Sequence, residues 1–295
     1  MQSLTDIRAV RELLERHGFH FSKALGQNFL VNPSVCPRMA QACGASPESG
    51  VLEIGPGIGV LTRELSRRAG KVVSVELDSR LFPVLKETLS GYDNVRLVAG
   101  DAMKLDLHSL IREEFTRPDG SRMPVCVCAN LPYYITSPLL MRLLEDRLPL
   151  TSVTVLVQKE AAERLCAQPG TRACGAVTMA VQYYAEAKML FGVSRGSFLP
   201  PPKVDSKVMQ LCLRECPPVD TKDTALMFRL IRAAFGQRRK TLANSLVTCG
   251  LSKEETVQAL SRAKIPATRR AEECTLQDFA RLADVVFQEN MCYTV

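Results

Sequence analysis

The chain has 295 residues, of which 46% are hydrophobic, so it can bury the core of one large domain or of a large and a small domain. No apolar run approaches the roughly 20 residues that a membrane-spanning helix needs, and no membrane association is expected. Residues 1–18 carry acids among the bases and lack an apolar core, so they predict neither a secretory signal nor a transit peptide. We therefore expect a cytoplasmic protein.

Cysteine content and charge limit the possible ligands. Eleven cysteines occur without a CxxC pair, and there are only three histidines, which predicts reduced thiols and no metal site. The net charge of +7 is compatible with a polyanionic partner without demonstrating one. Its distribution is more informative, because residues 229–247 contain five basic residues and no acid. A solvated basic face is the alternative interpretation of that segment.

The first third of the chain predicts a cofactor-binding βα unit. Residues 4–17 have the apolar spacing of a short amphipathic helix, and residues 21–30 resemble a loop. A predicted strand at 51–54 leads into Gly55-Pro56-Gly57-Ile58-Gly59 and then into a predicted helix at 60–68. The GxGxxG pattern fails because Val60 occupies its third glycine position, which favours a ligand without a pyrophosphate.

Two acidic residues follow the next two predicted strands. Glu76 ends a strand at 71–75, 21 residues beyond Gly55, and Asp101 follows a strand at 94–99. A carboxylate at the first of these positions can accept hydrogen bonds from both hydroxyls of a ribose. Either acid alone could be a solvated residue at a strand end. Two of them behind a glycine loop favour a nucleoside site.

The tetrapeptide Asn130-Leu131-Pro132-Tyr133 directly follows an apolar run at 125–129 that predicts a buried strand of a parallel sheet. Residues at this end of such a strand face the ligand crevice. Pro132 stiffens the tip, which presents an amide, a carbonyl and an aromatic ring. That set suits a flat heterocycle with an exocyclic amine, and an ordinary turn is the alternative.

The remaining strands and helices complete two predicted domains. Helices are expected at 137–144, with Ser137 as N-cap, at 159–167 and at 176–184, and strands at 153–157, 187–193 and 206–213. Phe198 precedes three prolines between the last two strands and is either a base-stacking ring or a hydrophobic plug. A linker near Cys216 precedes four predicted helices, at 224–235, 241–249, 253–263 and 276–288.

We therefore predict an α/β fold, with a Rossmann-like, mostly parallel sheet of seven strands in residues 1–215. Residues 216–295 are expected to form a smaller all-helical domain. The glycine loop, the two acids and the Asn-x-Pro-Tyr tip together resemble the class I S-adenosylmethionine-dependent methyltransferases that act on amino groups.

Four blocks make the resemblance more specific and point to the small-subunit ribosomal RNA adenine dimethyltransferase family. They are Lys23-x-Leu25-Gly26-Gln27-Asn28-Phe29-Leu30, Asn130-Leu131-Pro132-Tyr133, Phe198-x-Pro200-Pro201-Pro202-Lys203-Val204-x-Ser206 and Phe235-x-x-Arg238-Arg239-Lys240-Thr241-Leu242. The resemblance covers about residues 18–285. One departure is Tyr134, where many members have Asn or a similar small polar residue.

The resemblance implies dimethylation of N6 on two adjacent adenosines near the 3′ end of the small-subunit (16S) ribosomal RNA, in ribosome biogenesis. The resemblance also implies that S-adenosyl-L-methionine is the cofactor and that the partner is the small-subunit ribosomal RNA of a pre-ribosomal particle. We expect the protein to be a monomer. The implied cofactor site consists of Asn28, Leu30, Gly55, Glu76, Asp101 and Asn130, to which the glycine loop adds Gly57.

The predicted mechanism uses hydrogen-bond acceptors to make the target amine nucleophilic. The Asn130 side-chain oxygen and a backbone carbonyl at Leu131 or Pro132 would bind the hydrogens of adenine N6. Tyr133 and Phe198 would clamp the purine. Arg238, Arg239 and Lys240, on a segment with a helical pattern, would bind RNA phosphates.

Three alternatives are kept at this point. One is a methyltransferase of the same family that modifies a single adenosine in large-subunit RNA and confers antibiotic resistance. Another is a non-catalytic factor in ribosome assembly or transcription on the same fold. The third, a dehydrogenase, is disfavoured by the glycine spacing and by the Asn-Leu-Pro-Tyr tip.

Overall fold

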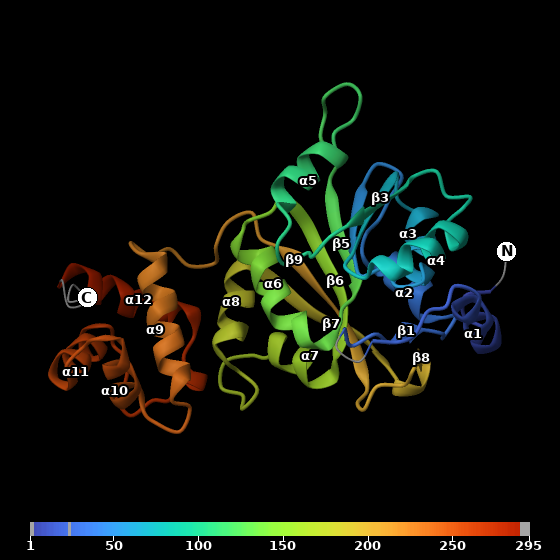
Figure 1. Ribbon diagram of the computed structural model, residues 1–295. Helices are drawn as coiled ribbons and strands as arrows, with labels where there is room; N and C mark the ends of the chain where they lie inside the picture. The colour runs from blue at the N-terminus through green and yellow to red at the C-terminus, as the bar shows by residue number, and fades with distance from the viewer. Residues whose placement is uncertain (1–2, 23–24, 290–295) are drawn as a thin grey trace. The chain divides into compact units, whose positions relative to one another are not determined.

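The computed structural model describes residues 3–22 and 25–289 (Figure 1). The chain divides into two compact units, one of Met1–Ala162 with Glu186–Leu213 and one of Glu163–Ala185 with Arg214–Val295. The chain passes from the first unit to the second for the last time between Leu213 and Arg214, close to the linker predicted near Cys216. Residues 163–185 differ from the predicted division, because their buried side chains, among them Met179 and Tyr183, share a core with helices of the C-terminal segment.

The first unit is built on a seven-stranded sheet with the order β4-β3-β2-β5-β6-β9-β7. The strands are β2 (Gly50–Ile54), β3 (Lys71–Glu76), β4 (Val95–Ala99), β5 (Val125–Asn130), β6 (Leu150–Gln158), β7 (Ala185–Val193) and β9 (Ser206–Leu213). Strands β2 to β6 pair in parallel, and β9 is antiparallel to β6. The predicted Rossmann-like sheet of seven mostly parallel strands is confirmed.

Strand order explains where a ligand can bind. The chain runs outward from β2 to β4 and then returns to place β5 on the other side of β2. In open α/β sheets, the crevice lies at the carboxyl ends of the two strands that flank this reversal. Here those ends carry the glycine loop, after Ile54, and Asn130. The topology therefore brings two predicted motifs together.

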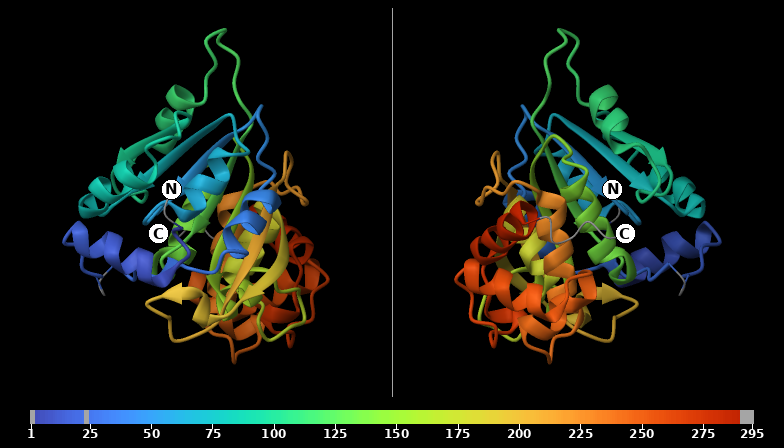
Figure 2. Two further views of the ribbon diagram at one scale, coloured as in Figure 1. Left: turned by 90° about the vertical axis from the view of Figure 1, so that its right-hand side faces the viewer. Right: turned by 90° about the vertical axis from the view of Figure 1, so that its left-hand side faces the viewer.

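Helices flank the faces of the sheet (Figures 1 and 2). The helices up to residue 165 are α1 (Ile7–Arg16), α2 (Val35–Ala42), α3 (Val60–Ser66), α4 (Phe82–Thr88), α5 (Leu107–Glu114), α6 (Thr136–Glu145) and α7 (Lys159–Leu165), of which α1 packs against α4 at the edge of the sheet. Met39 of α2 and Leu65 of α3 pack with Val51 and Cys128 of the sheet. Because helices cover it, strand β2 is buried at every position, and its residues other than Glu53 are apolar.

A second sheet was not predicted. Strands β1 (Phe29–Leu30) and β8 (Phe198–Leu199) pair antiparallel, with Leu30 opposite Phe198. The two strands belong to two segments that the sequence predicted to be loops. Their pairing fixes Leu30 and Phe198, two predicted site residues, opposite each other on neighbouring strands.

The second unit is helical. It contains α8 (Ala176–Tyr184), α9 (Thr224–Gly236), α10 (Leu242–Ser245), α11 (Lys253–Arg262) and α12 (Leu276–Gln288). Side chains of Asp223, Ser252 and Thr275 cap the N-termini of α9, α11 and α12. Between residues 214 and 289 the structure contains no strand, as predicted.

The described residues show neither a membrane span nor a metal cluster. None of the helices in residues 3–22 and 25–289 is long and apolar enough to cross a bilayer. In the same ranges, no three His, Cys, Asp or Glu residues are grouped so that they could hold a metal ion.

Candidate active site

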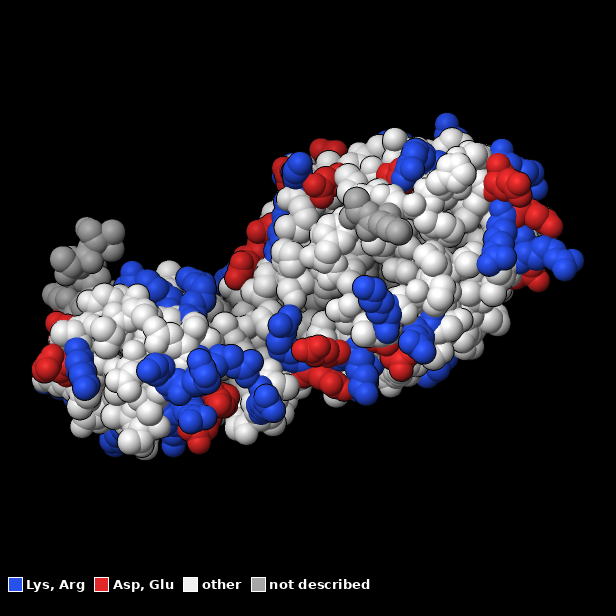
Figure 3. Space-filling view, turned by 60° about the horizontal axis from the view of Figure 1, so that its bottom comes forward, with Lys and Arg blue, Asp and Glu red and all other residues white. Residues whose placement is uncertain are grey.

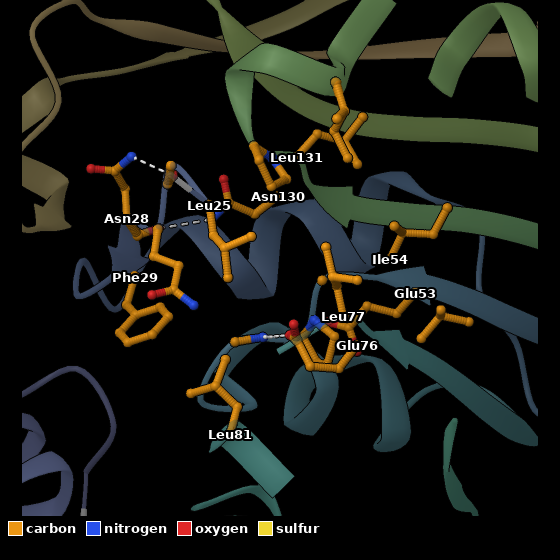
Figure 4. Close-up of a pocket in the computed structure, with 18 of the residues that line it drawn as sticks. Leu25, Asn28, Phe29, Glu53, Ile54, Glu76, Leu77, Leu81, Asn130 and Leu131 are labelled. Atoms are coloured by element: carbon orange, nitrogen blue, oxygen red, sulfur yellow. Dashed lines mark hydrogen bonds between the residues drawn. The ribbon is translucent and has the colours of Figure 1, made fainter. Parts of the chain in front are cut away.

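One pocket opens at the carboxyl ends of the strands (Figure 4). Every residue that the sequence predicted for catalysis or cofactor binding lines it: Asn28, Leu30, Gly55, Gly57, Glu76, Asp101, Asn130, Leu131, Tyr133 and Phe198. Lys23, part of the first motif, lies outside the described residues. The structure therefore joins three motifs that are separated by up to 170 positions, from 28 to 198, in the sequence.

The glycine loop forms one wall of the pocket. Gly55, Gly57 and Gly59 have φ angles of 71°, 59° and 86°, a left-handed conformation that side chains disfavour. The Gly57 N–H donates to Glu76 Oε2 at 3.2 Å, and the Asp78 N–H donates to Oε1 at 2.8 Å. These bonds fix the carboxylate while leaving it further lone pairs for a ligand.

Glu76 and Asp101 lie at the ends of neighbouring strands, as the sequence predicted. Glu76 is buried, and burial raises the pKa of its carboxyl group. Asp101 Oδ1 accepts from the Met103 N–H at 2.9 Å. Leu77, Leu81 and Met103 line the pocket beside these acids. The sequence did not predict these apolar residues, because nothing distinguishes them from core residues before the pocket is known.

Asn130, the last residue of β5, is held by its amide nitrogen. Its Nδ2 donates to the backbone carbonyl of Asn28 at 3.2 Å (Figure 4). A carbonyl can only accept, so this contact identifies Nδ2 and leaves Oδ1 as the available acceptor. Among the described residues, none donates a hydrogen bond to that oxygen. The amide is thus oriented as the predicted mechanism requires.

The backbone after Asn130 distinguishes between the two predicted carbonyls. The Pro132 carbonyl accepts from the Ile135 N–H at 3.2 Å and from the Thr136 hydroxyl at 3.3 Å. The Leu131 carbonyl receives no hydrogen bond from the described part of the chain, although its N–H donates to Leu156. Leu131 is therefore the residue whose carbonyl is available beside the Asn130 oxygen.

The same turn corrects a helix boundary. The residues after Pro132 form a short 3-10 turn that continues directly into α6, which begins at Thr136. Ser137 is therefore inside the helix, and the prediction that it is the N-cap was wrong. The Thr136 hydroxyl, which bonds back to Pro132, helps to secure the start of the helix instead.

The aromatic residues of the site differ in exposure. Tyr133 is partly buried, and its hydroxyl bonds Ser206 Oγ at 2.7 Å, which fixes the ring at the pocket. Phe198 lines the pocket but is only 4% exposed and packs with Leu30 and Val208. Of the two interpretations left open, the hydrophobic plug fits this burial better. Tyr134, the departure from the family pattern, lines the pocket and is 54% exposed.

Glu53 is a buried acid that the sequence showed only as part of the glycine motif. Thr62 Oγ1 and Ser74 Oγ each donate to its Oε2 at 2.7 Å. Its Oε1 has no partner among the described residues, although the side chain is only 1% exposed. Burial raises the pKa of Glu53 to about 7. At mildly acidic pH, the lining of the pocket therefore includes the neutral carboxyl group of Glu53.

The basic residues of the second unit occupy a different local structure from the one predicted. Helix α9 ends at Gly236, so Arg238, Arg239 and Lys240 lie in the turn before α10, not on a helix. All three are exposed, but Arg238 donates to the carbonyls of Arg172 and Cys174 at 2.5 and 3.2 Å. Figure 3 shows Lys and Arg side chains gathered on one face of this unit, with few acids between them.

Fold and site together define a class I methyltransferase-like protein: a doubly wound sheet, a glycine loop, acids after β3 and β4, and an Asn-Leu-Pro-Tyr tip after β5. Residues 18–288 match the sequence profile of the ribosomal RNA adenine dimethylase family. The chain belongs to this family. The resemblance stated from the sequence, and with it the enzyme class of an rRNA adenine dimethyltransferase, is confirmed.

Curated relatives match over nearly their whole length. The chain is 48% identical to ribosomal RNA small subunit methyltransferase A of Geobacillus thermodenitrificans over 280 residues, which is 94% of each chain. It is 45% identical to the protein of the same name from Shouchella clausii, over 93% of each chain.

Two solved structures have the same fold over most of the chain. A dimethyladenosine transferase from Plasmodium falciparum superimposes with a TM-score of 0.75 at 26% identity, covering 90% of this chain and 100% of that one. The 23S rRNA methyltransferase ErmE gives 0.66 at 27% identity, covering 88% and 100%.

Proposed function

We propose that this protein transfers methyl groups from S-adenosylmethionine to N6 of two adjacent adenosines near the 3′ end of small-subunit ribosomal RNA, forming N6,N6-dimethyladenosine. The observation that carries the proposal is the pair of available acceptors at the end of β5, Asn130 Oδ1 and the Leu131 carbonyl. An exocyclic amine has two hydrogens, and this pair can accept both. The names and near full-length similarity of the relatives support the small-subunit substrate.

The pocket fits the proposed cofactor in its chemistry. The Glu76 carboxylate, held by two backbone N–H groups, can accept the hydroxyls of a ribose. Apolar side chains at Leu77, Leu81 and Met103 offer a surface for an adenine ring. The loop lacks the spacing for a pyrophosphate, and S-adenosylmethionine has none. This cofactor supplies a methyl group that is already electrophilic because its sulfur is positively charged.

The protein's own task is then to prepare and aim the nucleophile. The N6 lone pair is delocalised into the purine, and two acceptors that hold its hydrogens favour a pyramidal, nucleophilic nitrogen. Nitrogen attacks the methyl carbon as the carbon–sulfur bond breaks, and the resulting aminium loses a proton to water. No strong base is required. Alignment of the reacting atoms can contribute roughly 7–11 kcal/mol to lowering the barrier.

Tyr133 is proposed to stack on the target adenine, an interaction worth about 1–3 kcal/mol per base. Its hydrogen bond to Ser206 holds the ring in one orientation before the base arrives. Phe198, being buried, is proposed to form the apolar wall behind that site. The exposed cations Arg239 and Lys240 are proposed to bind phosphates of the RNA.

We further propose that the protein acts as a monomer in the cytoplasm, on RNA within an assembling small subunit. Methylation of a large-subunit adenosine is the competing proposal within the family, since ErmE shares the fold. The higher identity to small-subunit enzymes favours the first assignment. A non-catalytic role is disfavoured, because the acceptor pair and the Glu76 carboxylate are intact.

Asn130→Ala tests the proposal. The variant should lower methyl transfer by at least a hundredfold, because the oriented acceptor is lost, while RNA affinity stays within about twofold. Ser109→Ala, at a partly exposed position on α5, serves as a surface control and should retain full activity. If Asn130→Ala methylates as fast as the unmodified protein, Asn130 has no part in the mechanism.

A further inference from the structure

A continuous set of hydrogen bonds joins the two ends of the pocket. At one end, the Asp78 N–H donates to Glu76, as described above. Asp78 Oδ2 in turn accepts from Gln27 Nε2 at 2.7 Å. At the other end, the carbonyl of Asn28, the residue next to Gln27, accepts from Asn130 Nδ2 at 3.2 Å. Residues 25–28 therefore connect the ribose carboxylate to the amide that faces the target amine.

We infer that Gln27 is a positioning residue for the proposed methyl transfer, because it anchors residues 25–28 to Asp78 and so sets the Asn28 carbonyl that orients the Asn130 amide. The inference rests on the proposed function and extends it to a residue that lines the pocket but bonds neither Glu76 nor Asn130. Its consequence is that the pocket wall formed by residues 25–28 and the orientation of Asn130 depend on the same contact.

Gln27 is suited to this role because both ends of its amide are used. Its Nε2 donates to Asp78, while its Oε1 accepts from the Ser22 N–H at 2.9 Å. The segment that follows turns sharply at Gly26, where φ is 58°, and Asn28 Nδ2 bonds the Gly26 carbonyl at 2.9 Å. The backbone at Asn28 is thus held from within the segment and, through Gln27, from outside it.

Asp78, which accepts the hydrogen bond from Gln27, is itself held in place. Asp78 is buried, and Arg80 binds both of its oxygens, Nε to Oδ1 at 2.9 Å and Nη2 to Oδ2 at 2.7 Å. The Arg80 guanidinium also lowers the pKa of Asp78, so the acceptor stays ionised. A hydrogen bond to an ionised acceptor is roughly twice as strong as one between neutral groups. The Gln27 contact is therefore a strong link on a fixed base.

The first test removes the link without changing the side-chain length. Gln27→Met should weaken the affinity for S-adenosylhomocysteine, measured by isothermal titration calorimetry, by about tenfold, the value of one hydrogen bond to a charged group. The single-turnover rate at saturating cofactor should also fall by about tenfold, because Asn130 loses its orientation. A change in the rate at saturation separates positioning from cofactor binding alone.

Gln210→Met is the matched control. Gln210 is also partly buried, and its Nε2 donates to the Ala42 carbonyl at 2.6 Å, but it does not line the pocket. It should show a comparable change in melting temperature with unchanged affinity and rate. If both variants lose activity only in proportion to their melting temperatures, Gln27 has a structural role and the inference is wrong.

The second test exchanges donor and acceptor. Gln27→Glu places a carboxylate against Asp78 and should reduce the rate more than Gln27→Met does. In the double variant Gln27→Glu with Asp78→Asn, residues 27 and 78 again form a pair of one donor and one acceptor. The rate of this double variant should therefore return to that of the single variant Asp78→Asn. No recovery would overturn the inference. If the unmodified protein fails to methylate RNA, the proposed function fails, while the loss of affinity in Gln27→Met still tests whether Gln27 anchors the pocket wall at residues 25–28.

Discussion

The buried carboxyl group of Glu53 predicts an unusual dependence of stability on pH. Burial raises its pKa from the ordinary 4.5 to about 7. Between these values the folded protein holds a proton that the unfolded chain has released, so protonation favours the folded state. The contribution is complete below about pH 4.5 and is lost as the pH rises to about 7.

The magnitude follows from the two pKa values. Each factor of ten in proton affinity is worth about 1.4 kcal/mol, so the whole contribution is roughly 3 kcal/mol. Glu53→Gln keeps the shape and an acceptor for Thr62 and Ser74 but cannot ionise. Relative to the unmodified protein, the variant should therefore gain up to about 3 kcal/mol of stability between pH 4.5 and pH 8.

The assay is urea unfolding of both proteins, without cofactor, at intervals across this pH range. The difference between their free energies of unfolding isolates Glu53 from the other titrating groups. Glu113→Gln, at an exposed position on α5, is the matched surface control for the substitution itself. A pH-independent difference for Glu53→Gln would refute the conclusion that burial keeps this carboxyl neutral.

Three further outcomes are expected. Tyr133→Ala should lower kcat/KM for RNA about 5- to 150-fold through loss of a stack, whereas Tyr133→Phe should lose less than tenfold; equal effects would exclude stacking. Phe198→Ala should lower the free energy of unfolding by about 3–5 kcal/mol, and a change below 1 kcal/mol would contradict its burial. Arg239→Gln with Lys240→Gln should reduce the salt slope of RNA binding by about 1.4–1.8, and an unchanged slope would mean that neither contacts phosphate.

Much of the sheet could be predicted because helices cover it. Buried strands such as β2 and β5 consist mainly of apolar residues, which marks them in the sequence. The pocket residues follow from the rule that ligands bind at the carboxyl ends of such strands. Asn130, Glu76 and Asp101 could be predicted as site residues in this way.

The remainder depends on contacts between distant segments. Strands β1 and β8 have two residues each, too few for a periodic pattern, and their pairing helps to bury Phe198 together with residues such as Val208 of β9. The hydrogen bonds of Arg238 to the carbonyls of Arg172 and Cys174 join segments more than 60 residues apart, which no pattern in the sequence reveals. The choice of the Leu131 carbonyl required knowing that Ile135 and Thr136 occupy that of Pro132.

The most direct test of the central claim is product analysis on the proposed substrate. The protein would be incubated with small subunits that lack the modification and with methyl-labelled S-adenosylmethionine, and the RNA digested to nucleosides. The account predicts labelled N6,N6-dimethyladenosine at two adjacent positions near the 3′ end, and none with Asn130→Ala. Label in large-subunit RNA only, or no label in adenosine, would contradict it.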